Sequence, residues 1–176
     1  MRPIRPMAAA AALLALAGIA APATAQQRGQ QPPAAAPAAP QTFGSWLRGC
    51  ERSGRTEICS LRQLVAPTDS PRNPILAVAI GRLTSDRKMA MVFKLPVSIN
   101  REAGIGFRID ESPVISIPVQ GCDAGACTAA MTLDDEMQKR LRGGTKSVVM
   151  FRSPQGAAAV LPLSLQGLTR GLASLK

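Results

Sequence analysis

The sequence predicts an all-β domain with one short helix and a C-terminal helical turn, and three observations support this. Residues 42–176 fall into short segments that are rich in Val and Ile and punctuated by Pro and Gly, as is typical of strands joined by turns. Across Val114–Val119, branched side chains alternate with the others and so share one face. Apolar residues at helical spacing occur in only two short stretches near the end. At about 135 residues, this part of the chain has the usual size of one domain.

The strands are expected where apolar segments lie between turn residues. One of these segments, Ile75–Ile80, is almost continuously apolar, as is typical of a central strand buried on both faces. Turns are expected at Arg101–Gly104 and at Ser153–Gly156, and the second turn should close a hairpin. The predicted strands are Trp46–Cys50, Glu57–Gln63, Ile75–Leu83, Met89–Leu95, Gly106–Ile109, Val114–Val119, Cys127–Leu133, Ser147–Arg152 and Ala157–Leu163.

Two helices are expected after the seventh of these strands. The first covers Asp135–Leu141, with Thr132 or Asp134 as its N-cap, acidic residues at its start and basic residues at its end, which suits the helix dipole. The second covers Leu165–Leu175, where leucines recur at helical spacing. Two glycines weaken this second helix by about 1 kcal/mol each relative to Ala, so packing must stabilise it.

Residues 1–25 have the three parts of a secretory signal peptide. Arg2 and Arg5 give a positive start, Ala8–Ala21 is apolar, and residues 23–25 form an Ala-Thr-Ala cleavage site. The apolar run is shorter than the roughly 20 residues of a membrane-spanning helix. We therefore expect cleavage, with a mature protein that lies in the periplasm, at the outer membrane or outside the cell, and that has no transmembrane segment.

A tether is predicted between the signal peptide and the domain. Residues 26–41 contain only Gln, Pro, Ala, Gly and one Arg, which is too little apolar side chain to offset the entropy of ordering. The prolines favour an extended, disordered linker. A proline-rich ligand for an aromatic groove is the alternative.

The charge of the mature chain points to anionic neighbours. The full chain has 21 Lys and Arg against 11 Asp and Glu. Loss of Arg2 and Arg5 leaves 19 basic residues against 11 acidic ones, a net charge of +8. The candidate partners are an envelope or host-surface protein, lipid headgroups or another anionic polymer. Basic residues form no block and aromatic residues are only 3% of the chain, so no nucleic-acid partner is expected.

Four cysteines in an exported chain indicate two disulfides. Three pairings are possible, and the spacing favours Cys50–Cys59 and Cys122–Cys127, each of which closes a short loop that contains Gly. A zinc site is the competing interpretation, but the gaps are wider than is usual for zinc ligands and no His is present. A redox catalyst would carry C-x-x-C, which is absent. No metal and no cofactor is expected.

The sequence offers little for catalysis, and no catalytic residue is assigned. It has no His, no G-x-S-x-G and no S-x-x-K, so the usual nucleophile and base arrangements are missing. The alternative to a binding protein is a cell-envelope hydrolase that uses a carboxylate pair. Its candidates are Asp110 with Glu111 and the run Asp134-Asp135-Glu136. It requires Asp110, Glu111, Asp134 or Asp135 to lie in a cleft with a raised pKa.

The ordered motifs of the domain resemble those of the invasion-associated locus B family over about residues 43–175. The resemblance rests on Trp46, Cys50, Cys59 and Gln63, then Leu95-Pro96, then Cys122 and Cys127, and finally the segment Leu161–Leu168. An aromatic residue usually follows the glycine of the last motif, and Leu168 stands there instead.

This resemblance implies an immunoglobulin-like β-sandwich with two local disulfides, in an exported α-proteobacterial protein. The family is named for a role in host-cell invasion and is similar to no known enzyme, so the resemblance implies a binding or virulence-associated module. It also implies that Trp46 packs in the core near the Cys50–Cys59 bridge and that Gln63 satisfies buried backbone groups.

Overall fold

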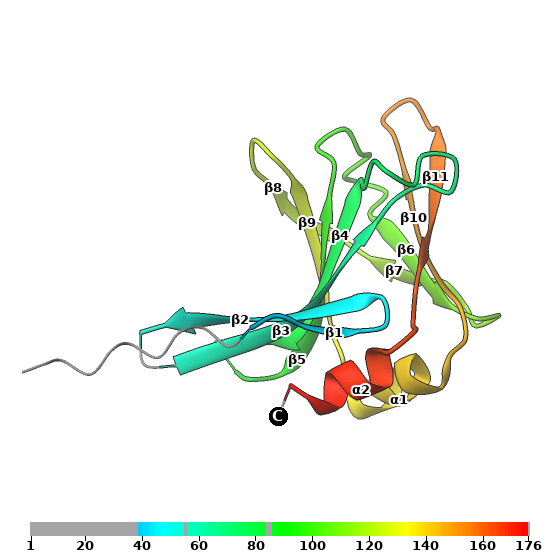
Figure 1. The fold of residues 1–176 in the computed structure, drawn as a ribbon. Coiled ribbons are helices and arrows are strands. Elements are labelled where there is room, and N and C mark those ends of the chain that lie inside the picture. Colours follow the sequence, from blue (N-terminus) through cyan, green and yellow to red (C-terminus); the bar gives the residue numbers. More distant parts are fainter. Residues whose placement is uncertain (1–38, 55, 84–85, 176) are drawn as a thin grey trace, which may run out of the picture. The chain divides into compact units, whose positions relative to one another are not determined.

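Two antiparallel β-sheets form the domain in the computed structural model, which describes residues 39–54, 56–83 and 86–175 (Figure 1). The larger sheet has seven strands in the order β1-β2-β3-β4-β5-β9-β8. These strands are β1 (Gln41–Phe43), β2 (Trp46–Ser53), β3 (Thr56–Val65), β4 (Leu76–Arg82), β5 (Met89–Leu95), β8 (Val119–Cys122) and β9 (Cys127–Thr132).

The smaller sheet has four strands in the order β11-β10-β6-β7. The Ser153–Gly156 turn joins β10 to β11, as expected, and the Gly156 N–H donates to the Ser153 carbonyl at 3.0 Å. The four strands are β6 (Ile105–Ile109), β7 (Ile115–Ile117), β10 (Ser147–Arg152) and β11 (Ala158–Leu163).

Both expected helices are present, and they lie together at one end of the domain (Figure 1). Helix α1 (Asp135–Gly143) begins after Asp134, whose carboxylate accepts a hydrogen bond from the Met137 N–H at 2.7 Å. Helix α2 (Leu168–Ala173) is shorter than predicted. Its N-cap is Gly167 in the left-handed conformation, which excludes the preceding residues from the helix.

The core lies between the facing sides of the two sheets. Side chains alternate along the strands, so that Leu76, Val78 and Ile80 of β4 are buried while the alanines between them are partly exposed. Phe93 of β5 and Phe107 of β6 meet across the sandwich with ring centroids 5.9 Å apart. The fold is therefore mostly β, as the sequence pattern predicts, and a sandwich, as the family resemblance implies.

The prediction that the β4 region is buried on both faces is wrong. Leu76, Val78 and Ile80 face the core, whereas Ala77 and Ala79 occupy the opposite face and are half-buried. A methyl group on a flat sheet is partly covered by its neighbours on adjacent strands. Alanine therefore made the run look apolar on both sides, although only one side lies against another layer.

The single strand predicted at Val114–Val119 is two strands in different sheets. Strand β7 ends at Ile117 in the smaller sheet, and β8 begins at Val119 at the edge of the larger one. Pro118 lies between them, and its missing N–H prevents a continuous ladder. The predicted alternation is nevertheless correct, since Ile117 is buried while Ser116 and Pro118 are exposed.

Strand β1 was not expected. It begins at Gln41, the last residue of the predicted disordered linker. The rest of that linker up to residue 38 and the predicted signal peptide lie outside the described residues. Within the described part of the chain, no helix is long and apolar enough to cross a membrane.

Candidate functional site

The four cysteines form two disulfides between directly paired strand residues. Cys50 of β2 lies opposite Cys59 of β3, and Cys122 of β8 lies opposite Cys127 of β9. Both bonds are formed, each with Cα atoms 4.0 Å apart, and no cysteine is free. This is the local pairing that the spacing favours. Each bond ties together two neighbouring strands that already pair through their backbones.

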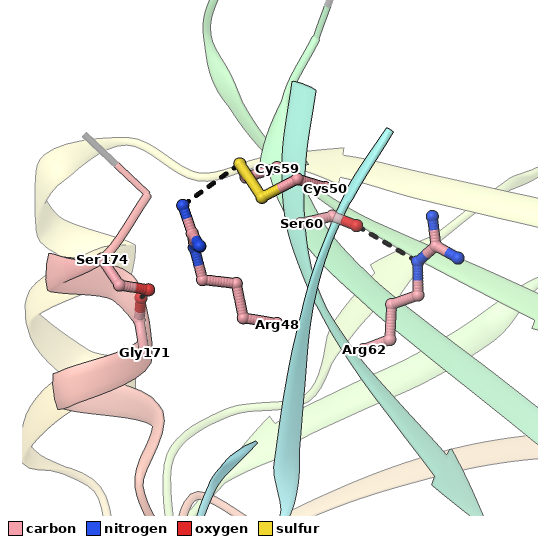
Figure 2. Close-up of a disulfide and its surroundings, with 7 residues drawn as sticks. All are labelled: Arg48, Cys50, Cys59, Ser60, Arg62, Gly171 and Ser174. Atoms are coloured by element: carbon pink, nitrogen blue, oxygen red, sulfur yellow. Dashed lines mark hydrogen bonds between the residues drawn. A yellow bond between two sulfur atoms is a disulfide. The ribbon is translucent and has the colours of Figure 1, made fainter. Parts of the chain in front are cut away.

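An arginine lies against the first disulfide. Arg48 of β2 extends beside the bridge on the side of α2, and its Nη2 donates to the Cys59 sulfur at 3.2 Å (Figure 2). The Arg48 Nε is buried and has no hydrogen-bond partner among the described residues. Glu57 lies close by, with its carboxylate and both sulfurs within 4.8 Å of one another. Sulfurs joined in a disulfide are not thiolates, so this group as it stands is no metal site.

Two of the carboxylates proposed for hydrolysis, Asp110 and Asp134, accept backbone hydrogen bonds. Asp110 accepts from the N–H and the hydroxyl of Thr145 and from the Lys146 N–H, at 2.8–3.3 Å. These hydrogen bonds, that of Lys146 foremost, hold the pKa of Asp110 below its ordinary value. A lowered pKa is the opposite of what a general acid needs. Asp134 is committed to the α1 cap.

One open pocket of about 470 Å³ does bring some of these acids together. It lies between the β6–β7 turn and α1, and Asp110, Glu111 and Glu136 line it together with Lys139 and Arg140. The predicted pair Asp134 and Asp135 does not line it. The structure thus brings Asp110 and Glu111 to one pocket, but the first of them is a structural hydrogen-bond acceptor with a lowered pKa.

The outward side of the smaller sheet is a continuous surface of apolar and basic residues, here called the outer face. It follows from the register, in which Met150 lies opposite Gly106 on one side and Val160 on the other. The next row holds Arg108, Val148 and Pro162, and the last pairs Arg152 with Ala158. The outer face comprises Gly106, Arg108, Val114, Ser116, Val148, Met150, Arg152, Ala158, Val160 and Pro162.

No other layer of the described chain covers this outer face. The two helices contact each other, and α2 packs on β1 and β2 of the larger sheet. Figure 1 shows both helices at the end of the domain, away from the middle of β6, β10 and β11. Val114 and Val160 are 53% and 58% exposed. Exposed branched residues that share one sheet face form a patch of the kind found at interaction sites.

Packing on the outer face centres on Gly106. A Cβ atom at Gly106 would lie 3.0 Å from Val114 Cγ1 and 3.2 Å from Met150 Cε, so these two side chains already close over the glycine. Arg108, on the same strand, has a buried Nε without a hydrogen-bond partner among the described residues. Long basic side chains commonly lay their aliphatic part along apolar surface and keep their outer nitrogens in water, and the buried Nε of Arg108 fits that arrangement.

A smaller pocket of about 280 Å³ lies at one end of the outer face. Met150, Arg152, Ala158 and Val160 are among its lining residues. The Arg152 side chain is exposed, and its Nη1 donates to the Gly156 carbonyl at 3.1 Å. This hydrogen bond holds the guanidinium at the pocket while leaving other donors free.

The outward side of the larger sheet differs in character. Its central positions on β4 are Ala77, Ala79 and Gly81. Arg62 on β3 forms an ion pair there with Glu51, so its charge is already matched. Leu64 is 70% exposed beside them. The outer face of the smaller sheet, by contrast, has two arginines and no acidic residue on its strands.

The sequence did not point to the outer face as a site. Val148, Val149 and Met150 are all apolar, so the pattern predicts a strand without showing which side faces the core. Arg108 and Arg152 are far apart in the chain and reach one surface only through the pairing of β6 with β10. The available signal was the apolar run Val148–Phe151, in which Val148 and Met150 occupy alternate positions that a solvated face would fill with polar residues.

Comparisons with known proteins agree with this architecture. The model of the family described as "Invasion associated locus B (IalB) protein" matches residues 46–176. No curated protein matches the sequence. Among solved structures, invasion associated protein B from Bartonella henselae is similar in fold, with a TM-score of 0.66 and 19% sequence identity. The similarity covers 78% of this chain and 94% of the Bartonella chain.

Proposed function

The chain belongs to the invasion-associated locus B family, and from this premise we propose that it is an exported, non-enzymatic module that binds an acidic protein of the envelope or of a host surface. The observation that carries the proposal is the outer face of the smaller sheet. It is uncovered, apolar across its middle and basic at Arg108 and Arg152. Two disulfides and the family fit an exported protein.

Hydrophobic burial would supply the binding energy. Contact with Val114, Met150 and Val160 would remove apolar surface from water, which is worth about 25 cal/mol per Å². An apolar surface of this kind suits a protein partner better than a polysaccharide, whose surface is mostly hydroxyl groups. The larger sheet also exposes leucines, Leu47 and Leu64, but its Arg62 is already paired with Glu51.

Charge would select the partner. Arg108 and Arg152 face outward with no acidic residue on the strands around them, so an acidic partner would satisfy both guanidinium groups. The mature chain carries a net charge of +8, which adds long-range attraction to the same class of partner. Binding of this kind weakens as salt screens the charges.

The carboxylates support a binding role over hydrolysis. Asp110 and Asp134 accept hydrogen bonds from backbone N–H groups, and the pKa of Asp110 is lowered by them. Their positions are explained by holding a loop and capping α1. No step of catalysis is needed to account for them.

Photocrosslinking in intact cells tests this function. A photoreactive amino acid replaces Val114 on the outer face, and in a matched control it replaces Leu64, which is exposed on the other sheet. We expect a reproducible protein adduct from position 114 and none of the same mass from position 64. The adduct should weaken with Arg108→Glu and with about 1 M salt, where the screening length falls to about 3 Å.

Two outcomes would count against the binding role. Equal adducts from positions 114 and 64 would mean that contact with the chain is non-specific. A specific adduct that is insensitive to both salt and Arg108→Glu would mean that charge does not select the partner.

A further inference from the structure

The free edge of β11 is the place where a partner can join the fold directly. We propose that an extended, acidic segment of the partner pairs with residues 158–161 as a fifth strand of the smaller sheet. This inference rests on the proposed binding function and adds to it the form of the partner and the backbone groups that hold it. Such strand addition is a general mode of peptide recognition.

Strand β11 differs from the other three sheet edges. The edge strands β1 and β7 have three residues each and β8 has four, whereas β11 has six. Pro118 lies between β7 and β8, and β8 has a register shift at Val119. Short strands, prolines and bulges are the usual protection of an edge against pairing. The first four residues of β11, Ala-Ala-Val-Leu, contain neither proline nor charge.

The backbone of β11 presents free hydrogen-bonding groups at alternate residues. The Ser153 N–H donates to the Ala157 carbonyl at 2.8 Å, which sets the phase of the ladder between β10 and β11. Alternation then directs the backbone groups of residues 159, 161 and 163 toward β10 and those of 158, 160 and 162 outward. The third outward position is Pro162, which has no N–H to lose.

Ala158 and Val160 therefore hold the open donors and acceptors of this edge. Among the described residues, neither one has a hydrogen-bond partner outside the β10 pairing. An antiparallel guest strand could exchange hydrogen bonds with both. Pro162 would end the pairing, which limits the guest to a short segment.

The side chains next to this edge indicate what the guest carries. The pocket of about 280 Å³ lies beside Val160 and is lined by Met150, so an apolar side chain of the guest fits there. Arg152 lies directly opposite Ala158 and also lines the pocket. A carboxylate on the same face of the guest, two residues from that apolar side chain, would reach the Arg152 guanidinium.

Charge favours an acidic partner over a second copy of this chain. If two copies paired through their β11 edges, the Arg152 side chains of both copies would lie near the same joint. Each mature chain also carries a net charge of +8. Like charges at close range are unfavourable. An acidic segment reverses the sign of this interaction.

The test uses the mature, oxidised full chain and the synthetic peptide Thr-Glu-Thr-Val-Thr-Glu-Thr-amide, labelled with fluorescein at its N-terminus, in which Val and both Glu share one face of the strand. A matched peptide has Lys in place of both Glu, and another has N-methyl groups on alternate residues, which removes the N–H groups of one edge. We expect anisotropy to show binding of the acidic peptide only. Hydrogen exchange should show new protection at the amides of Ala158 and Val160.

Two variants of one residue isolate the backbone contribution. Val160→Pro removes the outward N–H without removing a donor to β10, and Pro162 shows that the strand accepts proline in this phase. Val160→Thr keeps the N–H and nearly the same shape. Loss of one good hydrogen bond should weaken binding by about tenfold in Val160→Pro, with a much smaller change in Val160→Thr. Circular dichroism confirms that both variants are folded.

The outcomes separate this inference from the proposed function. If Val160→Pro binds as tightly as the parent chain while Arg108→Glu weakens both the peptide and the cellular adduct, binding uses the outer face and strand addition is wrong. If neither Val160→Pro nor Arg108→Glu weakens peptide binding or the cellular adduct, both proposals fail. If sedimentation shows a concentration-dependent dimer that Val160→Pro abolishes, the occupant of the edge is a second copy and the acidic guest is wrong.

Discussion

The side-chain amide of Gln63 pairs with the backbone of Ser164, 101 residues further along the chain. Gln63 Nε2 donates to the Ser164 carbonyl at 3.0 Å, and the Ser164 N–H donates to Gln63 Oε1 at 2.9 Å. Trp46 Nε1 donates to the same carbonyl at 2.9 Å. Gln63 and Trp46 lie in the larger sheet and Ser164 follows β11 of the smaller one, so these hydrogen bonds join the two sheets.

Substitution Gln63→Glu should therefore destabilise the domain in a pH-dependent way. At neutral pH the new carboxylate would face the Ser164 carbonyl with an acceptor instead of a donor, in a site where Gln63 is only 8% exposed. The expected loss is at least about 1–3 kcal/mol, the cost of an unsatisfied buried group. The loss should shrink in acid, because the protonated carboxyl can donate again.

Urea denaturation followed by the fluorescence of Trp46, the single tryptophan, measures this effect at pH 7 and pH 5. Gln155→Glu makes the same chemical change at an exposed turn and serves as the control. Equal small losses in both variants would show that the Gln63–Ser164 pair does not hold the sheets together.

A second prediction concerns two glycines that pack back to back. Gly167 has a φ of +82°, and a Cβ atom there would lie 2.2 Å from the Phe43 carbonyl oxygen. Gly44 has a φ of +58°, and its Cβ would lie 2.4 Å from the Gln166 carbonyl oxygen. Backbone on both sides prevents any adjustment by a flexible side chain, so Gly167→Ala should abolish folding or soluble expression.

Gly156→Ala is the matched control for this clash. Gly156 also has a positive φ, +89°, but a Cβ there meets nothing within 4 Å. Its cost should be limited to backbone strain of about 1–3 kcal/mol. Thermal melting of both variants separates the two effects, and similar stabilities would mean that the turn at Gly44 moves aside.

Local sequence patterns were sufficient for most of the fold because most strands here alternate clearly and end at turn residues. Strands β5 and β10 have the predicted bounds. Strand β1 could not be found in this way, since its three residues are held by pairing with β2 and not by their own pattern. The split of Val114–Val119 between two sheets likewise depends on which neighbours each half meets.

The candidate site was less accessible to sequence reasoning than the fold. The cysteine pairs are close in sequence, so spacing favoured the pairs that the structure forms. The outer face instead combines residues from β6, β10 and β11, and its position depends on register. A single sequence shows that Val160 is apolar but not that no other layer covers it.

Removal of a disulfide gives a third prediction. Cys122→Ser with Cys127→Ser opens a loop with a sequence separation of 5, and Cys50→Ser with Cys59→Ser opens one of 9. In the chain-entropy model each loss costs about 2–3 kcal/mol, with the larger cost for the longer loop. Urea denaturation of the two double variants tests the order, and peptide mapping without reductant that links Cys50 to Cys122 would contradict both pairs.

The last prediction concerns the acid dependence of stability and Asp110. Hydrogen bonds from Lys146 and Thr145 lower the pKa of Asp110 from 3.8, so the folded state favours the ionised carboxylate more than the unfolded state does. The stabilisation is therefore complete above the unfolded pKa and is lost as the pH falls below 3.8 through the lower folded value.

Asp110→Asn keeps one acceptor oxygen and suits the φ of +48° at this position, but it removes the charge. We expect Asp110→Asn to be less stable than the parent chain at pH 6 and the difference to shrink as the pH falls below 3.8 and the parent carboxyl becomes protonated. Asp69→Asn, at an exposed position, should follow the parent chain throughout. A gap between Asp110→Asn and the parent chain that stays constant from pH 6 to pH 2 would show that the charge of Asp110 does not hold the β6–β10 connection.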